Sequence, residues 1–202
     1  MSFFLTNSKP ARRSSFNFEV NSHGNSKLKN VHLSILHKPL KGFKAKSVPS
    51  SNALDIPDNF LDVEVSACKP HFFYFHYLQD NEKDEGWGCA YRSLQTLFSW
   101  FLLQGLTSKA VPSILEIQKI LVAMGDKEKS FIQSREWIGA FEVSFVIQKQ
   151  LGFACNIQHI SSGAQVSSLL PVFENHFRTV GSPIMIGGGV LAYTLLGLLF
   201  VI

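Results

Sequence analysis

Apolar residues are unevenly distributed along the chain. Residues 1–60 mix Ser, Asn, Lys and Pro, and their apolar stretches are brief; only Val31–Leu36 alternates like a short strand. Beyond residue 60, Phe, Tyr, Leu, Ile and Val become dense and clear periods appear. The change predicts a basic, low-order tail or linker over residues 1–60 and one globular domain over 61–202, with the boundary between Pro57 and Lys69.

Four segments of the domain have a helical pattern. In Cys89–Leu103 the apolar residues recur at the spacing i, i+3, i+4, i+7, i+8, which is typical of a helix buried along one side. These residues are Leu94, Leu97, Phe98, Phe101 and Leu102. Three further helices are predicted, over Ser113–Ala123, over Glu136–Leu151 with Gly152 closing it, and over Val166–Phe177.

The last segment, Ile184–Ile202, is apolar and carries no charged residue. A run of this length would just span a bilayer core as a helix. The preceding Pro183, the β-branched residues and the three glycines Gly187–Gly189 favour two strands and a turn instead. We therefore expect no membrane span, and helices followed by strands predict an α/β (α+β) fold class.

Composition and charge limit the number of domains and the kinds of partner that the chain can have. A chain of 202 residues with 46% hydrophobic residues can bury one sizeable core. Residues 1–50 hold nine Lys/Arg against Glu19 alone, so the net charge of +4 comes from the front of the chain. A nucleic-acid or membrane-surface tail, a transit peptide and a solvated linker are all compatible with this front. We favour the linker and expect no nucleic-acid partner.

The three cysteines, Cys68, Cys89 and Cys155, form no CxxC pair and no even set. This pattern indicates a reducing compartment and at least one free thiol, and it gives no reason to expect a metal or another cofactor. The opening apolar run is too short for a signal-peptide core. We expect a cytoplasmic protein, with association to the endoplasmic reticulum as a second option.

Candidate chemistry is concentrated at Cys89. This residue follows Gly86-Trp87-Gly88 and opens the first predicted helix. The positive end of a helix dipole stabilises a thiolate, which is the reactive form of cysteine. Gly88 leaves room for a substrate carbonyl near backbone N–H groups, and Trp87 could form a wall of the substrate channel. The spacing alone leaves open that Cys89 is a small buried hydrophobe.

The segment Gly86–Thr96 resembles the active-site segment of the ubiquitin-fold-modifier-specific cysteine proteases. Three further stretches resemble the same family in the same order, so the resemblance covers roughly residues 70–197. They are Gln118–Lys127, Ser134–Gly139 with Glu142, and Pro183–Thr194. The resemblance implies a papain-like fold and a thiol-dependent peptidase or isopeptidase. Such an enzyme trims the modifier precursor to its C-terminal glycine and releases the modifier from conjugates, with Cys89 as nucleophile.

The resemblance also implies a role for Tyr77, which lies twelve residues before Cys89. In the family a tyrosine at this spacing contributes its hydroxyl to the oxyanion hole, and a phenol is a suitable donor. Without the resemblance, Tyr77 would be read as a core aromatic next to Phe72–Phe75. Modifier and conjugates are the expected partners.

The family's base and its orienting partner come from an Asp-Pro-His motif, and this sequence contains none. We expect the chain to be truncated before that motif and to be feeble or inactive, because acyl transfer without a base loses several orders of magnitude. His159 and His176 are not expected to replace the base. Two alternatives remain open: a non-catalytic modifier-binding module, and an autophagy-type cysteine protease, which shares the Gly-Trp-Gly-Cys segment.

Overall fold

The computed structural model describes residues 2–10, 31–35, 47–48 and 63–201. Its strands are β1 (Ser2–Pro10), β2 (Val31–Ile35), β3 (Ser47–Val48), β4 (Val63–Ala67), β5 (Phe72–Phe73), β6 (Phe153–His159), β7 (Ile184–Gly188) and β8 (Leu191–Val201). Its α-helices are α2 (Cys89–Leu103), α3 (Ile114–Ala123), α4 (Ala140–Leu151) and α5 (Leu170–Thr179), and three short 3-10 helices are η1 (Gln79–Asn81), η2 (Lys129–Phe131) and η3 (Gly163–Leu169).

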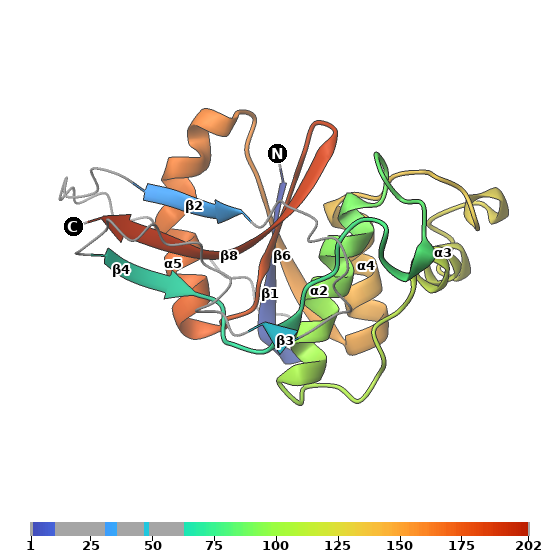
Figure 1. Ribbon diagram of the computed structural model, residues 1–202, viewed down its shortest axis with the longest axis horizontal. Helices are drawn as coiled ribbons and strands as arrows, with labels where there is room; N and C mark the ends of the chain where they lie inside the picture. Colours follow the sequence, from blue (N-terminus) through green and yellow to red (C-terminus); the bar gives the residue numbers. More distant parts are fainter. Residues whose placement is uncertain (1, 11–30, 36–46, 49–62, 202) are drawn as a thin grey trace.

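The main sheet is antiparallel in each strand pair of its described residues and follows the order β2-β8-β7-β1-β6, with β4 also paired to β8. In Figure 1 α5 lies on one side of the molecule, against β4 and β8, while α2, which packs against β8 and β7, and α4, which packs mainly against β6, lie on the other side. The short strand predicted at Val31–Leu36 is β2. Strand β1 lies in a segment for which the sequence predicted low order, and it pairs with both β6 and β7. The domain boundary near residue 60 stays a prediction.

Strands β7 and β8 form a hairpin, which confirms the predicted pair of strands with a turn. Gly188 pairs with Leu191, so the connecting loop consists of Gly189 and Val190. Gly189 has a φ of 59°, a conformation that glycine adopts without steric cost. Within the described part of the chain, no helix has the length and apolarity needed to cross a membrane.

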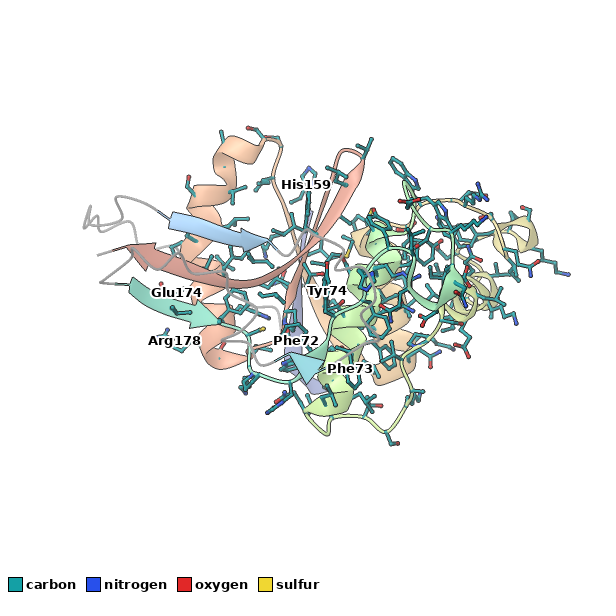
Figure 2. The ribbon with its side chains drawn as sticks, viewed as in Figure 1. Phe72, Phe73, Tyr74, His159, Glu174 and Arg178 are labelled. Carbon is teal, nitrogen blue, oxygen red and sulfur yellow. The ribbon has the colours of Figure 1, made fainter. Side chains whose placement is uncertain are left out.

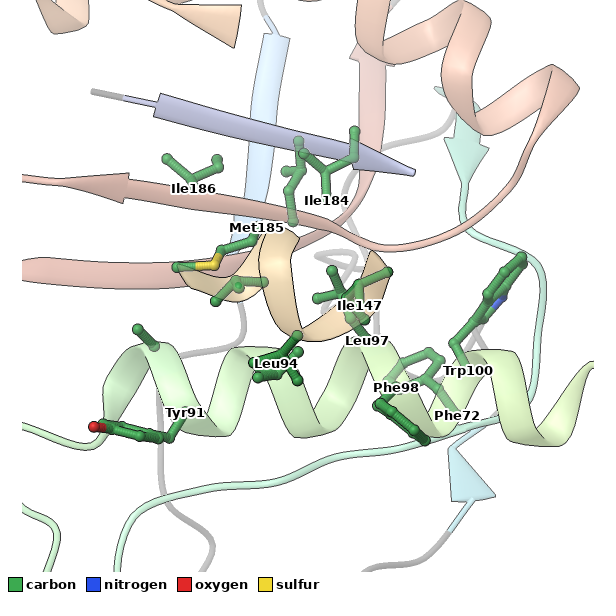
Figure 3. Close-up of a cluster of buried hydrophobic side chains, with 14 of the residues drawn as sticks. Phe72, Tyr91, Leu94, Leu97, Phe98, Trp100, Ile147, Ile184, Met185 and Ile186 are labelled. Carbon is green, nitrogen blue, oxygen red and sulfur yellow. The ribbon is translucent and has the colours of Figure 1, made fainter. Parts of the chain in front are cut away.

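Helix α2 runs through the centre of the core. Leu94, Leu97, Phe98 and Phe101 are each at most 1% exposed, as their spacing predicted. The prediction of a helix buried along one side is wrong, however, because every residue from Ala90 to Phe101 is buried. Figure 3 shows Leu94 and Leu97 on the side of α2 that faces Ile147 of α4 and the side chains of β7, whereas Phe98 lies beside Phe72. The helix ends at Leu103, and Gly105, whose φ is 70°, lets the N–H groups of residues 105 and 106 bond back to carbonyls of the last turn. The core therefore fixes the position of the first residue of α2, Cys89.

The other helices depart from prediction only at their ends. Helix α3 begins after Ser113, which forms a capping box with Glu116. Helix α4 begins at Ala140 rather than Glu136, because the Glu142 carboxylate accepts a hydrogen bond from the N–H of Gly139 and caps the helix there. It ends at Gly152, as predicted. Helix α5 begins later than predicted, since residues 163–169 form a 3-10 helix ahead of it.

Candidate active site

Cys89 is the first residue of α2, and Gly88 is the N-cap residue. The first N–H groups of an α-helix lack partners within the helix, so this end carries partial positive charge next to the thiol. The chain reaches it through Gly86, whose φ of 82° requires glycine. Helix α2 extends for 15 residues and is buried over most of its length, so the thiol sits on a rigid support.

Two cavities meet at Cys89. One, of about 110 Å³, lies between the segment Tyr74–Tyr77, the first turn of α2 and the start of β8. The other, of about 240 Å³, lies between Trp87, the segment Trp137–Phe141 and the β7–β8 hairpin. Cys89 lines both cavities, and so do the first two residues of β8. The thiol is therefore reachable from two sides, as a nucleophile that attacks an extended peptide must be.

Tyr77 lies next to Cys89, so the structure brings together the two residues singled out in the sequence. Burial raises the pKa of the Tyr77 hydroxyl well above its ordinary value, and a hydrogen bond with the Cys89 side chain raises it further. At neutral pH the hydroxyl thus keeps its proton and can donate a hydrogen bond into the first cavity.

The other two cysteines lie in different surroundings. Cys68 is 2% exposed, and burial raises the pKa of its thiol to about 12. Burial likewise raises the pKa of the Cys155 thiol far above its ordinary value. Both therefore stay protonated near neutral pH and are poor nucleophiles. All three thiols are free, and of the three it is Cys89 that lines the two cavities.

Neither His159 nor His176 lines a cavity at Cys89, which agrees with the expectation that they do not replace the base. His159 is exposed at the end of β6 (Figure 2), and His176 is buried in α5, where its Nε2 lies 3.0 Å from the carbonyl oxygen of Ser182. Of the described residues that line the two cavities at Cys89, the one histidine is His76, which sequence reasoning passed over. Its Nδ1 lies 2.7 Å from the Tyr77 carbonyl oxygen, so Nδ1 carries the proton in this contact. The sequence signal was its place directly before Tyr77.

An apolar rim surrounds the second cavity. Trp87 lines it, as expected of a channel wall, and is held by an indole hydrogen bond of 3.1 Å to the Lys83 carbonyl oxygen. Phe141 and Val190 on the same cavity are 62% and 64% exposed, and Trp137 is 48% exposed. Exposed apolar side chains gathered at one cavity are typical of a surface that binds another protein.

Comparison with known proteins places this arrangement in a family. The sequence profile of peptidase family C78 matches residues 63–200. The chain belongs to peptidase family C78. It is 54% identical over 133 residues to a probable Ufm1-specific protease of Oryza sativa subsp. japonica, an alignment that covers 66% of this chain and 21% of the relative. It is 44% identical over 161 residues to Ufm1-specific protease 2 of Danio rerio, covering 80% of this chain and 40% of that protein.

The fold of the chain is also similar to that of a solved structure. The crystal structure of UfSP from C. elegans superposes with a TM-score of 0.59 at 44% identity, covering 66% of this chain and 24% of that one. The match confirms the mixed α/β, papain-like fold class. The chain spans between about a fifth and two fifths of the length of these curated relatives.

Among the described residues, no group of three or more His, Cys, Asp or Glu side chains is arranged to hold a metal ion. The polar groups gathered at Cys89 include its thiol, the Tyr77 phenol and the backbone N–H groups at the start of α2.

Proposed function

We propose that this C78 chain acts on Ufm1 as a thiol-dependent peptidase and isopeptidase, maturing the precursor and removing the modifier from conjugates. The printed names of its relatives, which are Ufm1-specific proteases, support the substrate. The observation that carries the proposal is the position of Cys89, at the start of a buried helix, beside Tyr77, where two cavities meet.

In the proposed reaction, Sγ of Cys89 attacks the carbonyl carbon of the modifier's last glycine. The negative charge that develops on the carbonyl oxygen accepts a hydrogen bond from the Tyr77 hydroxyl. The C–N bond then breaks, the leaving amine takes up a proton, and a thioester remains on Cys89 for water to hydrolyse. Loss of one such hydrogen-bond donor lowers turnover by about 100-fold to 1000-fold in a well-studied protease.

The walls of the second cavity suit a glycine-containing end. Gly187, Gly188 and Gly189 carry no side chain, and they line it together with Trp137 and Phe141. In the proposal the extended end of the modifier lies along the glycines, and the exposed aromatic side chains contact the folded part.

A binding function without turnover is the second candidate. It is favoured by the exposed apolar side chains Trp137, Phe141 and Val190 at the second cavity, which suit the binding of another protein whether or not cleavage follows. The same cavities and apolar rim would then hold the modifier without cleaving it. We also propose a cytoplasmic location, on the basis of the three free thiols.

The test is hydrolysis of Ufm1 carrying a fluorogenic amide on its C-terminal glycine, with binding followed in parallel by calorimetry. We expect slow release of the fluorophore by the chain, at the low rate of a thiol that acts without a base, and none by Cys89→Ala, which should still bind. Tyr77→Phe should lower kcat by about 10-fold to 1000-fold with KM little changed. Tyr91→Phe is a matched control, because the Tyr91 hydroxyl bonds to the Glu136 carbonyl oxygen at 2.9 Å in the core.

The outcomes separate the two candidates. Turnover that persists in Cys89→Ala would refute the nucleophile. Binding of Ufm1 without any cleavage by the chain would establish the binding module in place of the enzyme, and absence of both would remove Ufm1 as the partner.

A further inference from the structure

A buried ion pair lies directly beneath the candidate site. Asp84 is fully buried and Arg92 is 3% exposed, and the Arg92 Nε atom lies 2.7 Å from Oδ2 of Asp84. Removing two charges from water is costly, and a buried pair seldom stabilises a fold more than apolar residues of similar size would. The burial of the pair is therefore better explained by the geometry that the pair imposes on its neighbours than by a contribution to the stability of the fold.

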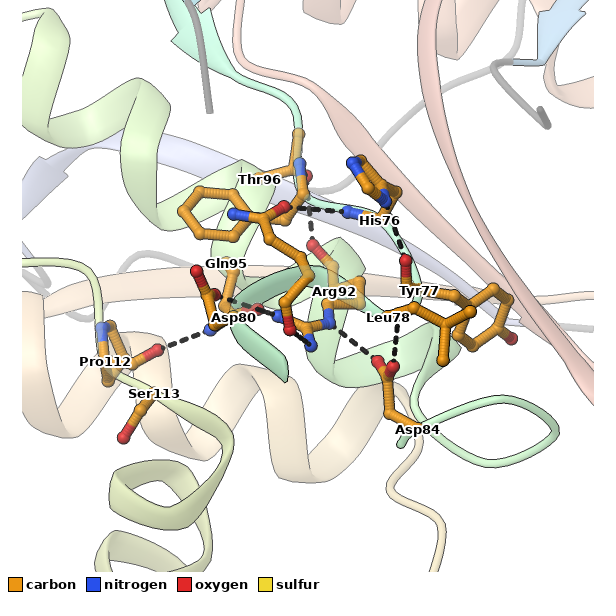
Figure 4. A network of polar contacts seen from close by, with 12 residues as sticks. His76, Tyr77, Leu78, Asp80, Asp84, Arg92, Gln95, Thr96, Pro112 and Ser113 are labelled. Atoms are coloured by element: carbon orange, nitrogen blue, oxygen red, sulfur yellow. Dashed lines mark hydrogen bonds and ion pairs between the residues drawn. The ribbon is translucent and has the colours of Figure 1, made fainter. Parts of the chain in front are cut away.

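The remaining polar atoms of the pair hold the backbone that follows Tyr77. Oδ1 of Asp84 accepts a hydrogen bond of 2.7 Å from the N–H of Leu78, and Nη2 of Arg92 donates one of 3.1 Å to the carbonyl oxygen of Gln79. Arg92 belongs to the first turn of α2, which begins at Cys89. Figure 4 shows the pair joining the 77–84 loop to this turn. Asp80, whose side chain is 62% exposed, forms a second and longer ion pair with Arg92, at 3.6 Å. Hydrogen bonds and ion pairs thus link the Tyr77 segment to the Cys89 segment, and the Asp84–Arg92 pair is the buried and shorter of the two ion pairs.

The loop that the pair holds is strained. Leu78, Asp80 and Asn81 have φ values of 60°, 60° and 62°, the left-handed region that residues other than glycine seldom adopt. Such conformations persist only where the surrounding structure enforces them, and they concentrate at functional sites. The Leu78 side chain is 50% exposed and so contributes little packing to hold its backbone. The contacts to Asp84 and Arg92 are what hold this segment.

Asp84 also lies against the residue before the thiol. A Cβ atom added to Gly88 would lie 2.6 Å from Cβ and 2.8 Å from Cγ of Asp84, and the Gly88 N–H bonds to the Asp84 carbonyl oxygen at 2.8 Å. A side chain at position 88 would therefore displace Asp84. The close approach ties the position of the carboxylate to that of Cys89.

We propose that the Asp84–Arg92 ion pair is a positioning device that holds the Tyr77 hydroxyl against the Cys89 thiol. The inference rests on the proposed function, in which these two groups act on the same carbonyl. Arg92 also lines the first cavity, but its guanidinium is engaged by Asp84 and Gln79, so in this proposal both residues act through the loop and the helix that they join.

The test is a double-mutant cycle on the reactivity of the Cys89 thiol, which requires no turnover. Iodoacetamide labelling of Cys89 at pH 7 is followed by mass spectrometry in the full chain, in Tyr77→Phe, in Arg92→Lys and in the double variant. Lysine keeps the charge but loses the planar fork that reaches Asp84 and Gln79 together. Each single change should slow labelling by about 10-fold, through loss of the phenol hydrogen bond to the thiolate.

The double variant decides between positioning and a general structural role. If Arg92 acts through Tyr77, Cys89 should be labelled no more slowly in the double variant, Tyr77→Phe with Arg92→Lys, than in either single variant. Losses that multiply to about 100-fold, or an Arg92→Lys rate equal to that of the unchanged chain, would overturn the proposal. Lys127→Met is the matched control, since it removes another ion pair, 2.8 Å from Nζ to the Glu142 carboxylate, and should leave the rate unchanged.

Thermal unfolding and hydrolysis of the Ufm1 amide are measured on the same proteins, to test whether each variant folds and whether the chain is a peptidase. Thermal unfolding checks each variant; if Arg92→Lys does not fold, Asp84→Leu with Arg92→Met replaces it, because apolar replacement of a buried pair usually preserves folding. That variant should also slow labelling by about 10-fold, and an unchanged rate would overturn the proposal. Hydrolysis of the Ufm1 amide is measured alongside: its absence from the unchanged chain rejects the proposed peptidase, whereas the labelling cycle still decides whether the ion pair sets the contact between Tyr77 and Cys89.

Discussion

Protonation of His176 should weaken the fold at mildly acidic pH. The side chain is 6% exposed in α5, and its Nε2 lies 3.0 Å from both the carbonyl oxygen and Oγ of Ser182. A carbonyl oxygen only accepts, so Nε2 carries the proton of the neutral ring and acid adds a second proton at Nδ1. Burial lowers the pKa of His176 to about 4, against the opposing effect of the Ser182 hydrogen bond.

The size of the effect follows from linkage. A histidine pKa of 6.5 in the unfolded chain and about 4 in the folded one means that the unfolded state binds more protons between these values. The contribution of His176 to the free energy of unfolding is therefore fully present above pH 6.5, and it is lost as the pH falls toward 4. The full loss is about 3.4 kcal/mol, at about 1.36 kcal/mol for each tenfold change in the protonation equilibrium. Between pH 7.5 and pH 5 the loss is about 2 kcal/mol.

Urea unfolding followed by tryptophan fluorescence at pH 7.5, 6.5, 5.5 and 5.0 measures this contribution. The comparison is with His176→Gln, whose amide can still donate to Ser182 but does not titrate. The variant should be less stable at pH 7.5, because glutamine fills less of the site than the ring, yet its free energy of unfolding should fall by about 2 kcal/mol less on going to pH 5. Equal falls in the two proteins would show that His176 is not held neutral by burial, and the reasoning would be wrong.

Two other predictions concern packing and capping. Leu97→Ala removes a fully buried side chain of α2 and should lower the free energy of unfolding by about 2–5 kcal/mol, measured by the same urea titration; a loss below about 1 kcal/mol would contradict the described core. Burial acts to raise the pKa of Glu142, but hydrogen bonds from Lys127 and the Gly139 N–H outweigh it and hold the pKa below its ordinary value. The resulting stability is present above the unfolded pKa and lost as pH falls through the folded one, so Glu142→Gln should unfold at a lower temperature at pH 7 but show a smaller difference at pH 3.

Local features of the site were predictable from the sequence. The recurrence of Leu94, Leu97 and Phe98 predicted helix α2 with its buried face, because hydrogen bonding within a helix imposes a period of 3.6 residues wherever the chain lies in the fold. The same reasoning put Cys89 at the start of α2. The pairing of Tyr77 with Cys89 was implied only by the family resemblance, and the structure places the two side chains together.

The tertiary structure alone decided which charged residues are buried in the loop between Tyr77 and Cys89. In sequence, Asp80, Glu82, Asp84 and Glu85 look alike, and a charge run of this kind is usually a solvated surface. Both Asp80 and Asp84 form ion pairs with Arg92, at 3.6 Å and 2.7 Å, yet the structure buries Asp84 completely and leaves the Asp80 side chain 62% exposed. No periodicity identifies such a partner, since the contact depends on the path of the loop between the two residues.

The order of the sheet is a second feature that the sequence did not determine. Strand β1 lies at the start of the chain, yet it pairs with β6 and β7, more than 140 residues away. Alternating apolar residues can indicate that a segment is extended, but every extended segment offers the same backbone N–H and C=O groups to its neighbours. Which strands become neighbours is decided by how α2, α4 and α5 cover the apolar faces of the whole sheet. The sequence by itself thus determined the helices and the place of Cys89 at the start of α2, whereas the strand order and the buried ion pair were decided by packing between distant segments.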